Sequence, residues 1–417
     1  MGLIINIDEA LKNRTEYNIL REPINDMLKN AQEAWEQKNP VDLLFTRGTL
    51  DKFQETYTDS IGFARAFAET SDYAVAPLFN THEGFSKVYT SRTFQGGFVI
   101  TQQVLEDQAY GKVKDTANRF IKRWHGDIVD YAMTAIGAGF GKEKKFDGVD
   151  AAPLKLLSAD TATGKIGDPI KCPLFSKAHT IVRRENDGAD KIVNNLQSNA
   201  FYVLDGTTKG IDYSDAAKVG KMADVINQVI TAMENYRDDN GKYAGVLGQK
   251  RIVIPNDAQL NALVTAALEM EMLSGFGPNP AYKRAVLETT PYLRDQNCCM
   301  KNGKAVGFFI VDPAYNAENH GPEFTERVAL TLNVENRKNP YGIAYDARQR
   351  FDVNVASWRG IAYVYIGNDA PDFNEIPVAN TNGTYDLKTG FDGLTAINPM
   401  LITKPVSVVG TVTTKQG

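Results

Sequence analysis

Residues 113–136 read VKDTANRFIKRWHGDIVDYAMTAI, and this stretch decides how the rest of the chain is arranged. Its apolar residues recur at intervals of three and four, which places them on one face of a helix. They are Val113, Ala117, Phe120, Ile121, Trp124, Ile128, Ala132 and Ile136. A helix of about 25 residues spans about 37 Å, roughly the width of a small domain. We therefore expect a long helix whose buried side, centred on Phe120, Trp124 and Ile128, is covered by strands from elsewhere in the chain.

The glycines after this stretch, Gly137, Gly139 and Gly141, predict the end of the helix through left-handed backbone conformations. They do not form a dinucleotide-binding loop, because such glycines follow a strand and open a helix. Lys142 is followed by Glu143, where a P-loop needs serine or threonine.

The composition is that of a globular protein of several domains. A chain of 417 residues exceeds what one core usually serves, and 43% of the residues are hydrophobic while 23% are charged. The net charge of −5 does not favour a sequence-reading nucleic-acid binder. We expect no membrane span, because no run of about 18 apolar residues occurs, and no secretion signal, because the start lacks basic residues. Three cysteines, Cys172, Cys298 and Cys299, favour a reducing compartment over a disulfide framework.

The segments before the long helix are predicted to be stable only when they pack on another part of the chain or on another chain. Helical patterns at 24–35 and 50–67 predict an N-terminal arm. Residues 74–79 and 85–94 are extended on either side of a turn at His82-Glu83-Gly84, but 85–94 has no apolar face. A hairpin without a buried face is unstable alone. We expect it to lie on a neighbour, in the same chain or another.

The remainder of the chain predicts a second, inserted domain. A helix over 211–236, a strand at 251–255, a helix capped by Asn256 or Asp257, and strands at 285–287 and 307–311 together indicate a compact α/β unit. Residues 327–367 are again strand-like and have no helix of their own, so we pair them with the long helix. After residue 368, Asn382-Gly383 signals a hairpin and 406–412 a last strand.

No constellation of residues predicts catalysis. Ser176 and His179 lack the Gly-x-Ser-x-Gly elbow of a serine hydrolase. His82, His125 and His320 form no metal-spaced pair, and no Cys-x-x-Cys occurs. We expect no enzyme, no cofactor and no metal. The basic residues at 112–123 indicate a solvated helix face or, alternatively, a surface that faces a polyanion.

The order of these parts resembles the major capsid protein of tailed bacteriophages, the Hong Kong 97 fold, and is nearest to the Mu-like major head subunit group. Short motifs add to the resemblance: PLFSKAH at 173–179 followed by NNL at 194–196, IVIP at 252–255 before a helix, and FFIVDP at 308–313. The resemblance implies an α+β fold of this type. Its parts would be an N-terminal arm (1–70), an extended β-hairpin loop (71–103), a peripheral domain with the spine helix (104–149 and 331–368), an axial domain (150–330) and a C-terminal β extension (369–417).

The function implied is a structural capsid subunit that self-assembles into pentamers and hexamers of an icosahedral shell enclosing double-stranded DNA. The candidate intersubunit contacts are Phe79, His82, Phe85, Lys87, Tyr89 and Arg92. Implied partners are other copies of the chain, a separate scaffolding protein, a portal, a decoration protein and packaged DNA held by non-specific contacts, with no membrane. The implied location is the virion, assembled in the host bacterial cytoplasm. The alternatives are an encapsulin-like nanocompartment shell and a two-domain serine hydrolase centred on Ser176 and His179.

Overall fold

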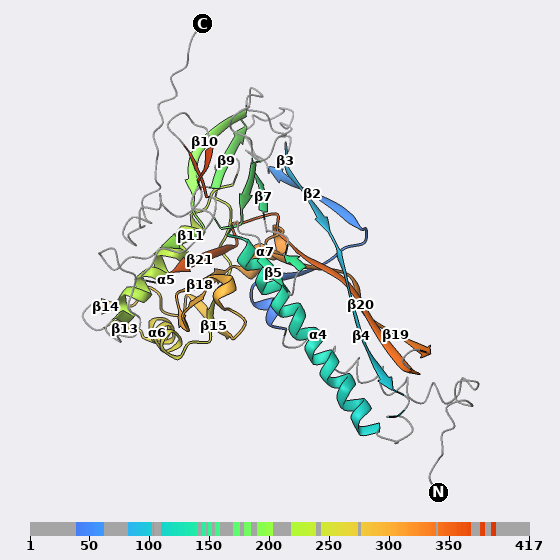
Figure 1. Ribbon diagram of the computed structural model, residues 1–417. Coiled ribbons are helices and arrows are strands. Elements are labelled where there is room, and N and C mark those ends of the chain that lie inside the picture. The colour runs from blue at the N-terminus through green and yellow to red at the C-terminus, as the bar shows by residue number, and fades with distance from the viewer. Residues whose placement is uncertain are drawn as a thin grey trace, which may run out of the picture.

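The computed structural model describes most of the chain between Asn39 and Lys388. The described residues are 39–61, 82–101, 103, 110–140, 144–146, 149–151, 155–158, 170–175, 179–184, 190–202, 218–238, 243–273, 277–338, 341–367, 376–379 and 385–388. The α+β class expected from the sequence is confirmed: two main sheets and one long helix organise the fold (Figure 1).

The long helix α4 (Tyr110–Ala138) lies beside a four-stranded sheet in the order β1-β19-β20-β4. The bounds of these strands are β1 (Thr46–Thr49), β4 (Arg92–Thr101), β19 (Glu323–Lys338) and β20 (Tyr341–Asn354). β1 runs parallel to β19, and the other two pairings are antiparallel. Figure 1 shows α4 running diagonally next to the long strands. The expected pairing of the helix with strands after residue 327 is therefore confirmed for β19 and β20.

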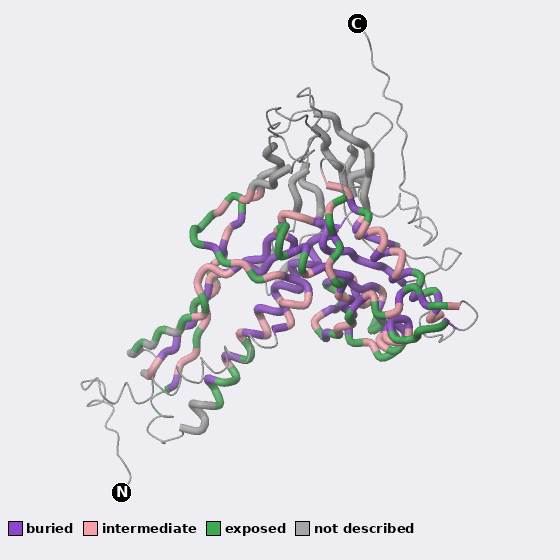
Figure 2. The backbone as a smooth tube through the Cα atoms, turned by 180° about the vertical axis from the view of Figure 1, so that it is seen from behind, coloured by how far each residue is buried: buried purple, intermediate pink, exposed green. Residues whose placement is uncertain are grey.

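The helix is buried unevenly along its length. Ala117, Ile121 and Ile128 of the expected stripe are buried, whereas Arg119, Lys122 and Arg123 are exposed and Asp127 is half-buried. From Tyr131 onward every residue to Phe140 is buried, so the C-terminal end of α4 enters the centre of the molecule (Figure 2). The C-terminal end of α4 is thus buried in the core, and the helix projects from the core toward its N-terminal end.

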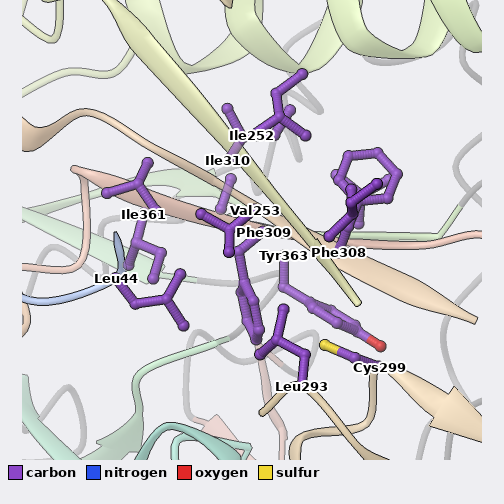
Figure 3. Close-up of a cluster of buried hydrophobic side chains, with 14 of the residues drawn as sticks. Leu44, Ile252, Val253, Leu293, Cys299, Phe308, Phe309, Ile310, Ile361 and Tyr363 are labelled. Atoms are coloured by element: carbon purple, nitrogen blue, oxygen red, sulfur yellow. The ribbon is translucent and has the colours of Figure 1, made fainter. Parts of the chain in front are cut away.

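The second sheet has five strands in the order β11-β21-β18-β12-β15. Their bounds are β11 (Ala200–Tyr202), β12 (Lys250–Pro255), β15 (Ala285–Thr290), β18 (Gly307–Val311) and β21 (Ile361–Tyr365). Helices α5 (Val219–Glu234) and α6 (Ala258–Glu269) belong to the same unit, and Asp257 caps α6 by accepting hydrogen bonds from two backbone amides. Figure 3 shows side chains of this sheet, among them Phe309 and Tyr363, packed in the core.

One strand lies in a different sheet from the one that we expected. Residues 361–366 were assigned to the sheet of the long helix, but β21 lies between β11 and β18. All five residues of β21 are buried. An apolar run without alternation fits a strand buried on both faces, which the centre of the five-stranded sheet provides.

The expected helix at 50–67 is wrong, because its described part forms strand β2 (Gln54–Ile61). Residues 39–50, which belong to the segment expected to form an arm, make contacts with the rest of the chain. The 3-10 helix η1 (Pro40–Leu43) and Leu44 pack into the core, and β1 joins the main sheet. The helix expected at 24–35 lies outside the described residues.

The hairpin differs from the expectation in its partner strand. β3 (His82–Thr90) pairs antiparallel with β2, so His82-Glu83-Gly84 begins a strand and the turn expected there is wrong. β2 follows β1 and β3 leads through Ser91 into β4, and β1 and β4 are the two outer strands of the four-stranded sheet. The hairpin is therefore a continuation of both edges of that sheet.

The described glycines near the end of the long helix do not have the left-handed backbone that we expected. Gly137 and Gly139 are not among the described glycines with positive φ. A Cβ at Gly137 would instead overlap the carbonyl oxygen of Gln296, next to the 3-10 helix η3 (Asp295–Asn297). Gly137 is needed for this close approach. Gly141 lies outside the described residues.

The other elements are short. They are β5 (Lys144–Phe146) with β6 (Val149–Ala151), β7 (Lys155–Ser158) with β8 (Ile170–Pro173), β9 (His179–Arg184) with β10 (Asp190–Gln197), β13 (Met272–Leu273) with β14 (Gly277–Pro278), β16 (Met300–Lys301) with β17 (Lys304–Ala305), and α7 (Pro313–Glu318). β22 (Ile376–Ala379) and β23 (Tyr385–Lys388) pair on either side of the expected Asn382-Gly383 turn. The strand expected at 406–412 lies outside the described residues. Within the described residues no helix is long and apolar enough to cross a membrane.

Candidate intersubunit surfaces

The residues named as the core of the long helix join it to the sheet. Phe120 packs on Phe98 of β4, with ring centroids 5.1 Å apart. Trp124 lies over Gly96, where a Cβ would come 3.2 Å from the indole ring, and its Nε1 donates a 2.6 Å hydrogen bond to Oε1 of Gln349. Ile128 is buried in the main core. These three residues therefore act within the subunit.

Arg92, a candidate intersubunit residue, takes part in a contact inside the chain. Its Nε lies 3.3 Å from Oδ2 of Asp352, whose Oδ1 accepts a 2.8 Å hydrogen bond from the hydroxyl of Tyr131. Burial raises the pKa of the Asp352 carboxyl, while Tyr131 and Arg92 oppose that rise. The cation of Arg92 thus compensates a buried acid and joins β4 to β20.

The other hairpin candidates have different surroundings. Tyr89 is fully buried and its ring lies tilted against that of Tyr57, with the ring centroids 4.4 Å apart, so its side chain offers no surface to another chain. Lys87 is half-buried and lies across the strand pair from Tyr57. His82 and Phe85 belong to β3 but their side chains lie outside the described part. Phe79 lies outside the described residues.

Among the described side chains at the hairpin, two exposed apolar residues were not selected by sequence reasoning. Val88 is 48% exposed and pairs across the strands with the exposed Thr56. Phe53, just before β2, is 54% exposed and lies 5.6 Å from the guanidinium carbon of Arg350. The alternation in β3 could have revealed Val88 as the neighbour of a buried Tyr89. Phe53 was hidden by its assignment to a helix.

A second group of exposed apolar residues lies in the unit built on the five-stranded sheet. They are Tyr243, Leu247, Met270, Met272 and Val286. Val286 is on β15, an edge strand of that sheet. When large exposed apolar side chains cluster in one region of a surface, that region is typically a protein–protein interface.

Strand edges of the four-stranded sheet are further candidate contact surfaces. Among the described residues β4 pairs only with β20, and β19 has β1 beside it only from Glu323 to Glu326. The rest of β19, to Lys338, therefore has one edge without a described strand partner. Such edges present backbone donors and acceptors to a further strand.

The exposed face of α4 carries mixed charge. Arg119, Lys122 and Arg123 are exposed, and Nε of Arg123 pairs with Asp127 at 2.8 Å. Asp115 is also exposed on this helix. The described part of the face is therefore only weakly basic, and its contact with a polyanion stays a prediction.

The residues considered for a serine hydrolase, Ser176 and His179, form no active site within the described part of the chain. Ser176 lies outside the described residues, and the side chain of His179 lies outside the described part. No group of three His, Cys, Asp or Glu residues that could hold a metal occurs within the described ranges. Burial lowers the pKa of His125 to about 4 and raises that of the Cys299 thiol.

No protein-family model matches the chain, and no curated protein matches it. Among solved structures, a chain of the satellite phage P4 procapsid including size determination (Sid) protein is 12% identical, with 81% of this chain and 90% of that chain covered and a TM-score of 0.40. A chain of the bacteriophage PhiM1 mature capsid is 10% identical, with coverages of 78% and 86% and a TM-score of 0.42. A chain of the virus-like particle from Pyrococcus furiosus is 9% identical, with coverages of 84% and 99% and a TM-score of 0.39.

Proposed function

We propose that this chain is the major capsid subunit of a tailed bacteriophage or prophage, with a Hong Kong 97-type fold of the Mu-like group. It assembles into pentamers and hexamers that close an icosahedral shell around double-stranded DNA. It has no catalytic role, and it forms part of the virion after assembly in the cytoplasm of a host bacterium.

The observation that carries this proposal is the hairpin formed by β2 and β3. It continues both outer strands of the main sheet and carries Phe53 and Val88 on its exposed surface. Tyr89 buries one face of β3 within the chain, whereas Val88 leaves an apolar side chain in water on the other face, which is best explained by a partner surface. Assembly needs only modest pair contacts, because each subunit touches several neighbours at once.

The other parts of this proposal follow from the same resemblance. The unit of the five-stranded sheet closes the rings, and its exposed Met270, Met272 and Leu247 are suited to contacts between copies. A separate scaffolding protein, a portal and a decoration protein complete the particle. Packaged DNA is held through non-specific contacts, for which the exposed cations of α4 are the candidate surface.

Electron microscopy and sedimentation of the purified full-length chain test the proposal. We expect closed shells, or pentameric and hexameric rings, whose fraction rises with protein concentration. A compact monomer at every concentration, both alone and after co-expression with a scaffolding protein, would overturn it. Labelling with an activated-serine probe would instead support the hydrolase alternative.

A further inference from the structure

The loop that leads into β12 is held by a buried ammonium group. Nζ of Lys250 donates hydrogen bonds of 2.9 Å to the carbonyl of Val246 and 2.8 Å to the carbonyl of Gly248. The same atom lies 2.9 Å from Oδ2 of Asp312, and the side chain of Lys250 is 1% exposed. An ammonium group has three donors, so each of them has an acceptor here. The cation therefore ties two carbonyls of one loop to the core of the unit built on the five-stranded sheet.

Leu247 lies between these two carbonyls, and its side chain faces solvent. It is 75% exposed, more than any other large apolar residue that the structure describes. Val246 before it is fully buried, and a Cβ at Gly248 would overlap Oδ1 of Asp312. The backbone on both sides of Leu247 is thus closely packed while the leucine itself is in water. A side chain on a fixed backbone loses less conformational freedom on binding than one on a mobile loop.

Four other exposed apolar side chains lie at the same end of this unit. The loop that carries Leu247 connects the end of α5 to β12. Nη2 of Arg284, just before β15, pairs with Glu234 at the end of α5 at 2.7 Å. The amide of Lys283 donates a 3.0 Å hydrogen bond to the carbonyl of Leu268 near the end of α6. These contacts bring the ends of α5 and α6 and the start of β15 together, and the apolar residues exposed there are Tyr243, Met270, Met272 and Val286.

The charges at this end of the unit have both signs. Glu269 and Glu271 are exposed at the end of α6, and Lys283 is exposed before β15. On the loop before β12, the guanidinium carbon of Arg237 lies 3.5 Å from the centroid of the Tyr243 ring. A second copy that is rotated relative to the first can bring its cations against these acids, which is a head-to-tail contact of the kind that closes rings. The chemistry of this surface therefore fits another copy of the same surface.

We propose that Lys250 is a positioning residue that presents Leu247 as a rigid apolar contact to a second copy of this chain. The inference rests on the proposed function and names one contact by which copies join. Leu247 touches the neighbouring copy, whereas Lys250 acts through Leu247 and stays inside its own subunit. The other exposed apolar residues of this end surround that contact.

Sedimentation velocity of the full-length chain over a range of concentrations measures the association constant between copies. We expect Leu247→Ser to lower this constant at least about tenfold, as the loss of a central apolar contact does. Leu247→Met keeps an apolar side chain of similar size and should associate like the wild type. Because Leu247 is exposed, thermal unfolding should be the same in both variants and the wild type.

The outcomes separate this inference from the proposed function. If the wild type associates and Leu247→Ser associates equally well, the inference is overturned and the proposed function stands. If the wild type is a monomer at every concentration, the proposed function is overturned and the inference with it.

The role of Lys250 is tested by replacing Lys250→Met and Asp312→Asn together, which removes both buried charges at once. Well below the melting temperature of this double variant, we expect about tenfold weaker association and faster hydrogen exchange at residues 246–249, with β18 still protected. Adding Leu247→Ser should cause no further loss, because both changes act through one side chain. Losses that multiply to about a hundredfold, or a double variant that associates like the wild type, would overturn the positioning role.

Discussion

The indole of Trp124 on α4 donates a 2.6 Å hydrogen bond to Gln349 on β20, and Nε2 of Gln349 donates in turn to Glu326 on β19 at 2.7 Å. A single polar chain thus crosses from the long helix through two strands. It begins at a ring that packs on the bare backbone of Gly96. The position of α4 along the sheet is therefore fixed by directional hydrogen bonds as well as by the burial of apolar side chains.

Truncating Trp124 should loosen this joint. We expect Trp124→Ala to lower the free energy of unfolding by about 3 kcal/mol and Trp124→Phe, which keeps a ring but loses the hydrogen bond, by about 1 kcal/mol. Urea unfolding measures both, with the exposed Lys122→Ala as the control. Equal stability of Trp124→Ala and the wild type would contradict the packing described here.

Two glycines of α4 should respond in opposite directions to alanine. A Cβ at Gly126 meets nothing within 4 Å, so Gly126→Ala should raise the free energy of unfolding by about 0.5–1 kcal/mol. Gly137→Ala should lower it by about 1–3 kcal/mol, because the Cβ would overlap backbone atoms of Gln296. Thermal unfolding of both variants decides the matter, and a stabilised Gly137→Ala would show that η3 does not approach the helix closely.

Replacing one member of the buried pair formed by Lys250 and Asp312 should strongly lower the free energy of unfolding. Nζ of Lys250 donates to Asp312 at 2.9 Å and to the carbonyls of Val246 and Gly248, with both charged side chains 1% exposed or less. We expect Lys250→Met to cost about 3–5 kcal/mol, because it leaves a carboxylate without its cation. Adding Asp312→Asn, which retains an oxygen to accept from the Tyr315 amide, should restore part of the loss in urea unfolding. No recovery in the double variant would refute the charge argument.

His125 should make the subunit sensitive to acid. Burial lowers its pKa to about 4, so the folded chain binds fewer protons than the unfolded chain below the ordinary histidine value. This contribution to stability is complete above about pH 6.5 and is lost as the pH falls toward 4, by up to about 3 kcal/mol. His125→Gln should flatten the dependence of unfolding free energy on pH in this range. The same slope in variant and wild type would exclude His125 as its source.

Charge on the outer face of the hairpin should prevent association without unfolding the chain. Val88→Glu places a carboxylate in water in the free subunit but would bury it beneath a neighbour, which is unfavourable without a partner. We expect normal circular dichroism and melting together with a loss of shells or rings in electron micrographs. Val88→Thr, which keeps the β-branched shape, should still assemble. Normal assembly of Val88→Glu would show that this face points away from neighbours.

Sequence patterns predicted elements whose partners are local or whose period is long. The stripe of α4, the Asp257 cap and the strand at 307–311 are of this kind. β2 was missed because Leu50, Phe53, Tyr57 and Ile61 are also spaced by three and four, and only pairing with the distant β3 selects the strand. The contact between the rings of His320 and Tyr57 was missed for the same reason, since no local pattern brings these two residues together.

The place of β21 has a consequence for how the protein is made. It lies between β11 and β18, so β11 cannot join the five-stranded sheet until the ribosome has released residues 361–365. Between the synthesis of β18 and that of β21, a nascent chain therefore has the edges of β11 and β18 unpaired, and chaperones have access to them. A chain cut short before residue 361 would keep these two edges open, and we expect it to aggregate, because unpaired strand edges recruit further strands.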